Sequence, residues 1–419
     1  PGNQFVRFPP LRGPPLHHGD LRGEFHHRPE RVSRKWEKNL FLVIIAGMRG
    51  IHLLNFVRTM TVTTVVFLAP FHFLELGFDG LGIGLVVALF AAAPILFSFP
   101  TGWANDRLSM KTVIVGGLLA MAVLFAAAGF VGGLAPMAAV FLLLGVANSA
   151  VNVSVNSLYY KDATEPDPNR KYGRFIGWLS LGPPAGLVLG SLVGRVAGFR
   201  TLLLIFAGLT ALSALALRGF GEERFAAVSI RDYRFSVFNR RTLLFSIFLV
   251  LLALHWGTEG TVYGPFLRAR FGLDDSGVAL YMAGAYLALS LAAFLVARLK
   301  FDPVRNRRLF LLGMTLSGLG LVLMTVGDVR LSFLFRFVHE GGDGLMGAFV
   351  VLTISRLFER RTIGGSAGIL TALQTSGHMA GSLAFSWLGF KAGLQVPMIA
   401  AGIVLLANAA FGLIAVPRD

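Results

Sequence analysis

The chain has 419 residues, of which 55% are hydrophobic and only 14% are charged, and its mean hydropathy is +0.68. Soluble domains carry about 25% charged residues, so this composition excludes an ordinary soluble protein and indicates apolar segments covered by lipid. The absence of cysteine excludes disulfide frameworks, thiolate metal sites and cysteine nucleophiles. The net charge of +16 indicates membrane topology rather than nucleic-acid binding, because Lys and Arg concentrate in short segments between apolar runs.

Residues 1–38 are polar, basic and rich in proline, which predicts a flexible tail without the apolar core of a signal peptide. Twelve apolar stretches follow, each close to the roughly 20 residues that cross a bilayer as a helix. The predicted spans lie near residues 50–76, 81–102, 112–132, 136–160, 172–195, 200–218, 242–270, 276–298, 307–327, 331–357, 364–390 and 396–416.

A longer polar segment divides these spans into six and six. The sequence therefore predicts an all-α membrane protein with a cytoplasmic tail (1–38), an N-terminal six-helix bundle (39–218), a central cytoplasmic loop (219–241) and a C-terminal six-helix bundle (242–419). Basic residues gather in the central loop and the even-numbered loops, which predicts that both termini are cytoplasmic.

The two halves also repeat at a shift of 195 residues. A parallel repeat whose offset equals the spacing of six spans predicts two pseudo-symmetric bundles. The matching positions are Pro70 with Pro265, Gly77 with Gly272, Asp79 with Asp274, and Gly82 with Gly277.

The turn after the second predicted span resembles the G-x-x-x-D-R-x-G-[RK]-[RK] signature of the major facilitator superfamily, through Gly102, Asp106, Arg107 and Lys111. The resemblance implies a twelve-helix transporter that works by alternating access, in which these four residues form a conformational latch. On physical grounds, Gly102 permits close helix approach and Asp106 can accept hydrogen bonds from a helix N-terminus. The run 182–186, Gly-Pro-Pro-Ala-Gly, partly resembles the span-five motif of drug–proton antiporters, which favours export.

Three acidic residues, Glu259, Glu340 and Asp343, lie inside predicted spans, where charges are costly and mark functional sites. His255 precedes Glu259 by four residues, as His339 precedes Asp343, so each pair can meet on one helix. Three interpretations remain open: a proton-coupling group, a metal path, or a static ion-pair network. The proton-coupling candidates are Glu259, Glu340, Asp343, His255, His339 and Arg336; the metal-ligand candidates are His255, Glu259, His339, Asp343 and His378.

The first half instead has Arg58, with Asn55 one helical turn before it. Asparagines spaced by four form one polar stripe on a helix face, which indicates either a substrate cavity or hydrogen bonds between helices. Arg58 and amide donors suit an anionic or zwitterionic solute. The predicted substrate-binding residues are Arg58, Asn55, Asn148, Asn152, Asn156, Gln374 and His378.

These patterns predict a proton-coupled secondary transporter for a small anionic or zwitterionic organic solute, with export favoured and no cofactor required. We expect a monomer in the bacterial inner membrane, whose partners are its solute, protons and lipid rather than nucleic acid. A metal or metal-chelate transporter and a lipid-handling or other non-transport membrane protein are the alternatives. No Walker loop, zinc-binding helix signature or nucleophile elbow is present, so we expect no enzyme.

Overall fold

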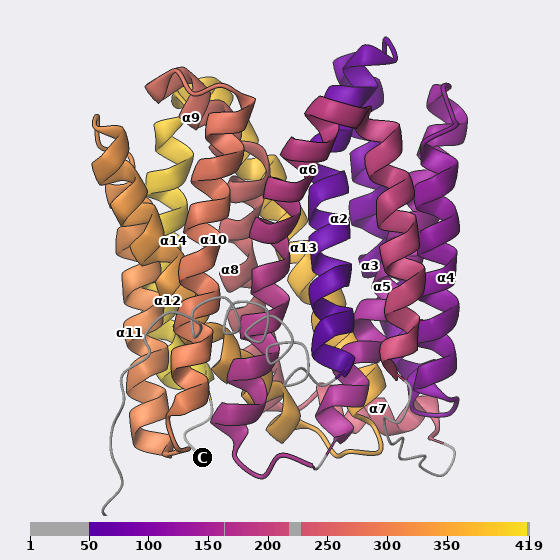
Figure 1. Ribbon diagram of the computed structural model, residues 1–419. Coiled ribbons are helices and arrows are strands. Elements are labelled where there is room, and N and C mark those ends of the chain that lie inside the picture. The colour runs from indigo at the N-terminus through magenta and orange to yellow at the C-terminus, as the bar shows by residue number, and fades with distance from the viewer. Residues whose placement is uncertain (1–49, 163, 218–227, 417–419) are drawn as a thin grey trace, which may run out of the picture. The chain divides into compact units, whose positions relative to one another are not determined.

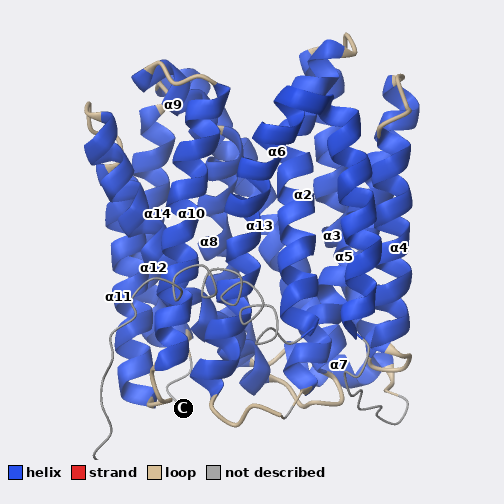
Figure 2. Ribbon diagram, in the orientation of Figure 1, coloured by secondary structure: helices blue, strands red, loops and turns tan. Residues whose placement is uncertain are grey.

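The computed structural model describes residues 50–162, 164–217 and 228–416, and within these ranges the chain is helical, with no strand (Figures 1 and 2). The predicted all-α fold is therefore confirmed. The predicted tail, 1–38, and much of the predicted central loop lie outside the described residues. The first half contains α2 (Gly50–Glu75), α3 (Gly80–Asn105), α4 (Met110–Ala128), α5 (Leu134–Lys161) and α6 (Pro168–Ser213), which continues into the 3₁₀ turn η1 (Ala214–Leu217).

A short helix, α7 (Ile230–Val237), follows the first half along the chain, and its residues Tyr233 and Val237 are buried. The second half contains α8 (Arg240–Thr261), α9 (Tyr263–Phe271), α10 (Asp275–Arg298), α11 (Pro303–Leu323), α12 (Val329–Leu357), α13 (Ile363–Ala392) and α14 (Gln395–Ala415).

Among the described residues, eight helical stretches are long and apolar enough to cross a membrane. One of them, residues 168–217, holds two of the predicted spans, because Gly198 adopts φ 78° and ψ 165° and so interrupts the helix. Helices α11, α12 and α13 are also long, at 21, 29 and 30 residues, but they carry more charged or small polar side chains. Together these helices account for the twelve predicted spans.

The seventh predicted span, 242–270, is wrong as a single helix. The helix breaks into α8 and α9 at Val262, whose N–H still donates to Thr258 O at 2.9 Å. Pro265 favours the break, because proline has no N–H and its ring clashes with the preceding turn, although Pro70 at the matched position lies within the unbroken α2. The break places Glu259 in the last turn of α8.

The predicted repeat corresponds to the same local geometry in both halves. The Asp79 carboxylate accepts a hydrogen bond from the N–H of Gly82 at 2.7 Å and caps α3, while Asp274 caps α10 through Gly277 at 2.8 Å. The glycine two residues before each cap has a positive φ, 80° in the first half and 66° in the second. The matched residues therefore begin equivalent helices.

The halves pack against each other chiefly through α6 with α10 and α3 with α13. We refer to the end of the molecule that carries the turns preceding α4, α6, α11 and α13 as the basic end; α7 lies there too (Figure 1). At this end Asn169 of α6 and Asn306 of α11 exchange two hydrogen bonds of 3.0 and 2.6 Å. Asp167 also accepts a 3.0 Å hydrogen bond from the N–H of Phe301, so polar contacts join the halves at the basic end.

Candidate functional site

The turn that follows α3 contacts the N-terminus of α13 in the other half. The two carboxylate oxygens of Asp106 accept hydrogen bonds from the N–H groups of Gly364 and Gly365, at 3.1 and 2.8 Å. These donors lie in the first turn of α13, where they have no partner within the helix and where the helix dipole favours a negative charge. A Cβ at Gly102 would overlap the carbonyl oxygen of Gly364, so α3 and α13 meet backbone to backbone.

Two further residues bind Asp106, and sequence reasoning missed both. Lys161 Nζ lies 2.7 Å from Asp106 Oδ1, and the Tyr233 hydroxyl donates to Oδ2 at 2.8 Å. The Lys161 side chain is only 2% exposed, although a lysine at the end of an apolar span is ordinarily interfacial. Burial raises the pKa of Tyr233, and the charge of Asp106 raises it further, so the hydroxyl remains a donor.

The two basic residues of the turn lie apart from this carboxylate. Arg107 donates from Nε and Nη2 to the carbonyl oxygen of Val228, at 2.9 and 2.5 Å, and its guanidinium lies 4.3 Å from the centre of the Trp103 ring. Lys111 is half-buried and makes no hydrogen bond or ion pair within the described ranges. Of the four predicted latch residues, the structure therefore brings Gly102 and Asp106 against α13.

Arg58 lies within α2 and is 6% exposed. Its Nε and Nη2 donate to Asn55 Oδ1 at 3.3 and 3.0 Å, and its Nη1 donates to Asn148 Oδ1 at 3.0 Å. No described carboxylate forms an ion pair with this guanidinium. A buried positive charge thus has amide oxygens as its partners, which compensate a cation less well than a carboxylate does.

The predicted asparagine stripe follows one face of α5. Its three members are partly exposed, whereas most of the α5 residues around them are buried. The two predicted polar residues of α13, Gln374 and His378, are also partly exposed. Of these five residues, only Asn148 forms a hydrogen bond with Arg58. The others make no side-chain hydrogen bond with any described residue: Asn152, Asn156, Gln374 and His378.

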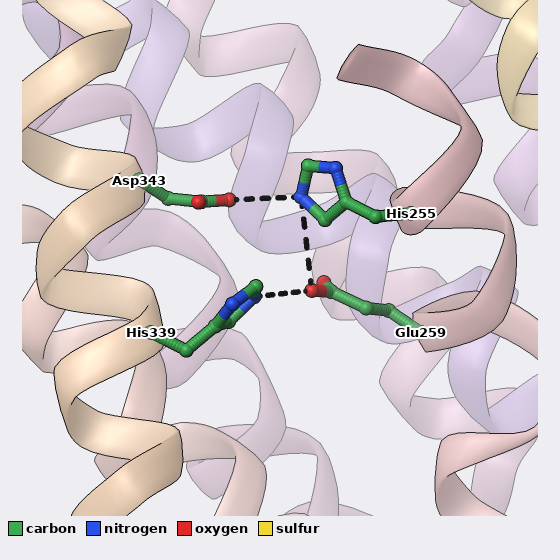
Figure 3. Close-up of side chains that lie close together, drawn as sticks. All are labelled: His255, Glu259, His339 and Asp343. Atoms are coloured by element: carbon green, nitrogen blue, oxygen red, sulfur yellow. Dashed lines mark hydrogen bonds and ion pairs between the residues drawn. The ribbon is translucent and has the colours of Figure 1, made fainter. Parts of the chain in front are cut away.

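A second polar group, the C-half cluster, consists of His255 and Glu259 on α8 and His339 and Asp343 on α12 (Figure 3). His339 Nε2 lies 2.6 Å from Glu259 Oε1, and His255 Nε2 lies 3.2 Å from Asp343 Oδ2. The predicted pairing along a helix is present on α8, where His255 Nε2 lies 4.0 Å from Glu259 Oε1, but this ion pair is longer than the contacts between the two helices. The close pairs instead cross between α8 and α12, because the two helices direct these side chains toward each other (Figure 3).

The other nitrogen of each imidazole is held by a backbone carbonyl. His255 Nδ1 contacts Leu252 O, and His339 Nδ1 lies 2.7 Å from Ser317 O. A carbonyl oxygen can only accept, so each Nδ1 carries a proton and each Nε2 faces a carboxylate oxygen. A neutral ring would direct its lone pair at that oxygen. Both contacts are therefore attractive only when a proton lies between the nitrogen and the carboxylate.

Arg336 connects this cluster to the third deep acid. It is fully buried, and it donates to Glu259 Oε1 at 2.9 Å and to Glu340 Oε1, one helical turn away, at 2.5 Å. Ser317 of α11 donates to Asp343 Oδ1 at 2.5 Å. Sequence reasoning missed Ser317, because a serine among glycines on an apolar helix carries no signal of a buried carboxylate partner.

The charges of this group determine what it can do chemically. Glu259, Glu340 and Asp343 together with Arg336 leave two negative charges, which one proton on each imidazole neutralises. The ligand atoms of the C-half cluster also lie within 4.8 Å of one another, a spacing that suits a transition-metal ion. His378, the fifth predicted metal ligand, lies outside that group of atoms.

Known proteins match this chain along most of its length. The sequence profile of the Major Facilitator Superfamily matches residues 51–300. The multi-drug resistance efflux pump PmrA of Streptococcus pneumoniae is 23% identical over 380 residues, 86% of this chain and 93% of that protein. The multidrug resistance protein MdtG of a Rahnella species is 22% identical over 396 residues, 90% of this chain and 93% of that protein. The MFS-type transporter ppzB of Metarhizium rileyi is 28% identical over 149 residues, which span 30% of its own length.

A solved structure, the human organic anion transporter MFSD10 (TETRAN), has the same fold, with a TM-score of 0.73 at 15% identity. The match covers 86% of this chain and 97% of the human one. The profile match extends over more than half of the chain, and the family expected from the turn after α3 is confirmed. The chain therefore belongs to the major facilitator superfamily, and it is an integral membrane transporter rather than an enzyme.

Proposed function

We propose that this protein is a proton-coupled antiporter that exports a small anionic or zwitterionic organic solute by alternating access. The solute binds at Arg58, and the C-half cluster carries the protons together with Arg336 and Glu340. The basic end faces the cytoplasm, as do both chain termini. The protein acts as a monomer in a bacterial inner membrane and needs no cofactor.

The environment of Arg58 carries the proposal for the solute. Burying a guanidinium costs free energy that two amide oxygens only partly offset. A carboxylate, sulfonate or phosphate of the solute completes that compensation through charge-assisted hydrogen bonds, which are stronger than those to a neutral amide. The partly exposed asparagines of α5 and the polar side chains of α13 then line the path of the solute.

The relatives support the direction and the substrate class. PmrA is described as a multi-drug resistance efflux pump, which favours export, and MFSD10 is described as an organic anion transporter, which agrees with a binding site built on Arg58. With an anion site in the first half and a proton site in the second, the solute and the protons would bind to different side chains.

The C-half cluster supports proton coupling because its contacts need protons. Loss of a proton from His339 would leave a lone pair facing Glu259 Oε1 at 2.6 Å in a buried site. The resulting uncompensated negative charge disfavours that packing of α8 against α12. Proton loss would therefore shift the protein toward another arrangement of these helices, which is the requirement for coupling.

The basic end, where polar contacts join the halves, supports the proposed latch. Asp106 and Gly102 hold α3 against α13, while Arg107 holds the segment before α7. These contacts must break when the halves separate at that end. Release and re-formation of the latch is the expected step between the cytoplasm-facing and outward-facing states.

Replacement of Arg58 tests the proposed function. In a thermal-unfolding screen of carboxylates, sulfonates, amino acids, sugars and cationic dyes, we expect anions or zwitterions to stabilise the purified wild-type protein. Arg58→Gln should remove that response, and Arg58→Lys should retain part of it, because lysine keeps the charge without the planar fork. Arg195→Gln, at an exposed position within α6, should respond like the wild type. Stabilisation by cations alone, or an equal response of Arg58→Gln, would contradict the proposal.

A transition-metal or metal-chelate transporter is the second candidate, favoured by the 4.8 Å grouping of ligand atoms. The guanidinium of Arg336, 2.9 Å from Glu259 Oε1, argues against it, because it repels a divalent cation and already occupies that oxygen. Thermal unfolding with Zn²⁺ separates the two candidates. Stabilisation of the wild type that is lost in His339→Ala would favour the metal, and indifference to Zn²⁺ would favour the proton.

A further inference from the structure

A small basic pocket lies at the basic end of the second half, away from Arg58 and the C-half cluster. Its cavity measures about 50 Å³ and opens between the ends of α8, α11, α12 and α14. Three arginines line it, Arg241, Arg307 and Arg356, and no acidic residue does. The remaining walls are chiefly apolar and include aromatic rings such as Phe310 and Phe349, both buried.

Two of these arginines are held in fixed positions. Arg307 Nη2 donates to Leu413 O at 2.6 Å, while its Nη1 is buried and has no hydrogen-bond partner in the described part of the chain. The guanidinium of Arg356 lies 4.5 Å from the centre of the Phe301 ring. Neither arginine forms an ion pair with a described carboxylate. A buried donor without an acceptor is costly, and an anion in the pocket would satisfy it.

We infer that this pocket binds the phosphate of an anionic phospholipid headgroup from the leaflet at the basic end. Guanidinium groups bind phosphate oxygens bidentately, and arginines at the ends of membrane helices recognise anionic lipids. The apolar walls distinguish a lipid from free phosphate, because they suit the glycerol and upper acyl carbons next to the phosphate. This inference goes beyond the proposed function and depends on neither the solute nor the coupling ion.

The pocket also adjoins the contact between the halves. Asn306 lines the pocket and exchanges hydrogen bonds with Asn169 of the other half. Phe301, which stacks with Arg356, donates its N–H to Asp167 of the other half. A bound headgroup would therefore hold the start of α11 in the position that it has when the basic end is closed. The lipid acts as a ligand that stabilises the closed basic end.

Thermal unfolding of the full chain in neutral detergent tests this inference with three probes: phosphatidylglycerol, phosphatidylcholine and inorganic phosphate. We expect phosphatidylglycerol to raise the Tm of the wild type and the other two to leave it unchanged. Arg307→Gln and Arg356→Gln should each weaken the apparent affinity for phosphatidylglycerol by about tenfold. Arg308→Gln is the matched control, because Arg308 is exposed and does not line the pocket.

Each outcome decides the question. An equal rise with phosphatidylcholine would mean that lipid acts without headgroup recognition and would overturn the inference. A rise with inorganic phosphate that equals the effect of phosphatidylglycerol would identify a free-anion site rather than a lipid site. An unchanged response of both Arg307→Gln and Arg356→Gln would place the lipid elsewhere. If Arg307→Gln fails to fold, Arg356→Gln compared with Arg308→Gln still decides the result.

Discussion

Replacement of Asp106 by asparagine should open the basic end. Its carboxylate accepts two hydrogen bonds across the halves, from Gly364 and Gly365. A hydrogen bond to a charged group contributes about 1.5 kcal/mol, and one to a neutral group about 1 kcal/mol. Asparagine retains one acceptor oxygen, so two charged bonds become one neutral bond, a loss of about 2 kcal/mol. The equilibrium should shift toward the open basic end by roughly 30-fold. The ion pair with Lys161 lies within the first half, so its loss lowers overall stability and largely cancels in this equilibrium.

The assay uses the absence of native cysteine. Asn169→Cys provides a probe, because Asn169 is 1% exposed and is covered by Asn306 and the Lys300 backbone of the other half. Maleimide should label this probe about 30-fold faster when Asp106→Asn is present, provided that labelling follows the open population. Glu359→Gln is the matched control, because that carboxylate lies at the same end, is exposed, and should leave the rate unchanged.

A labelling rate within about threefold of that of Asn169→Cys alone would contradict this prediction, because the expected change of about 30-fold is an order of magnitude larger. General loosening of the protein is a different outcome, and a second probe recognises it. Ser149→Cys lies inside the first half, 2% exposed and in contact with Ser98. Equal acceleration at both probes would mean unfolding of the first half rather than opening of the basic end.

Three further predictions concern the contacts of the basic end and the C-half cluster. Gly102→Ala should accelerate labelling of the buried probe, because its Cβ would overlap Gly364 O, whereas Gly84→Ala on α3 meets nothing within 4 Å and should not. The labelling rate, corrected for the thiolate fraction of the probe, should stay constant from about pH 6 to 8.5. The raised pKa of Tyr233 keeps its hydroxyl protonated, so its hydrogen bond to Asp106 stabilises the closed basic end at every pH below the ordinary tyrosine pKa near 10. A rise of the corrected rate in that range would contradict this role of Tyr233. Glu259→Gln should abolish transport driven by a pH gradient in proteoliposomes while leaving solute exchange, and full gradient-driven activity would defeat the coupling proposal.

The helices and the repeat between the halves follow from local sequence. A span is marked by about 20 apolar residues, and the starts of α3 and α10 by an aspartate three residues before a glycine, Asp79 and Asp274. The break within the seventh span could not be predicted from Pro265 alone, because Pro70 at the matched position lies inside an unbroken helix.

The candidate site was less predictable, because its contacts join residues far apart in the chain. Spacing of four along a helix places His255 near Glu259, yet the shorter contacts of both residues are with α12. Such pairing depends on how α8 and α12 are rotated about their axes, which no local pattern specifies. The sequence likewise suggests an interfacial position for Lys161, because its burial depends on Asp106, which lies 55 residues earlier in the chain.

Helix α13 links the two regions on which the proposed transport depends. Its first turn holds Asp106 through Gly364 and Gly365, and its later part packs on α8, where a Cβ at Gly377 or Gly381 would overlap the α8 backbone. Helices that meet backbone to backbone resist independent sliding, so α8 and α13 should move together. Proton loss that displaces α8 from α12 would then shift α13 and weaken the latch at its other end. The proposed coupling would therefore need no contact between proton and solute, because one helix of 30 residues links α8, which carries two residues of the C-half cluster, to the basic end.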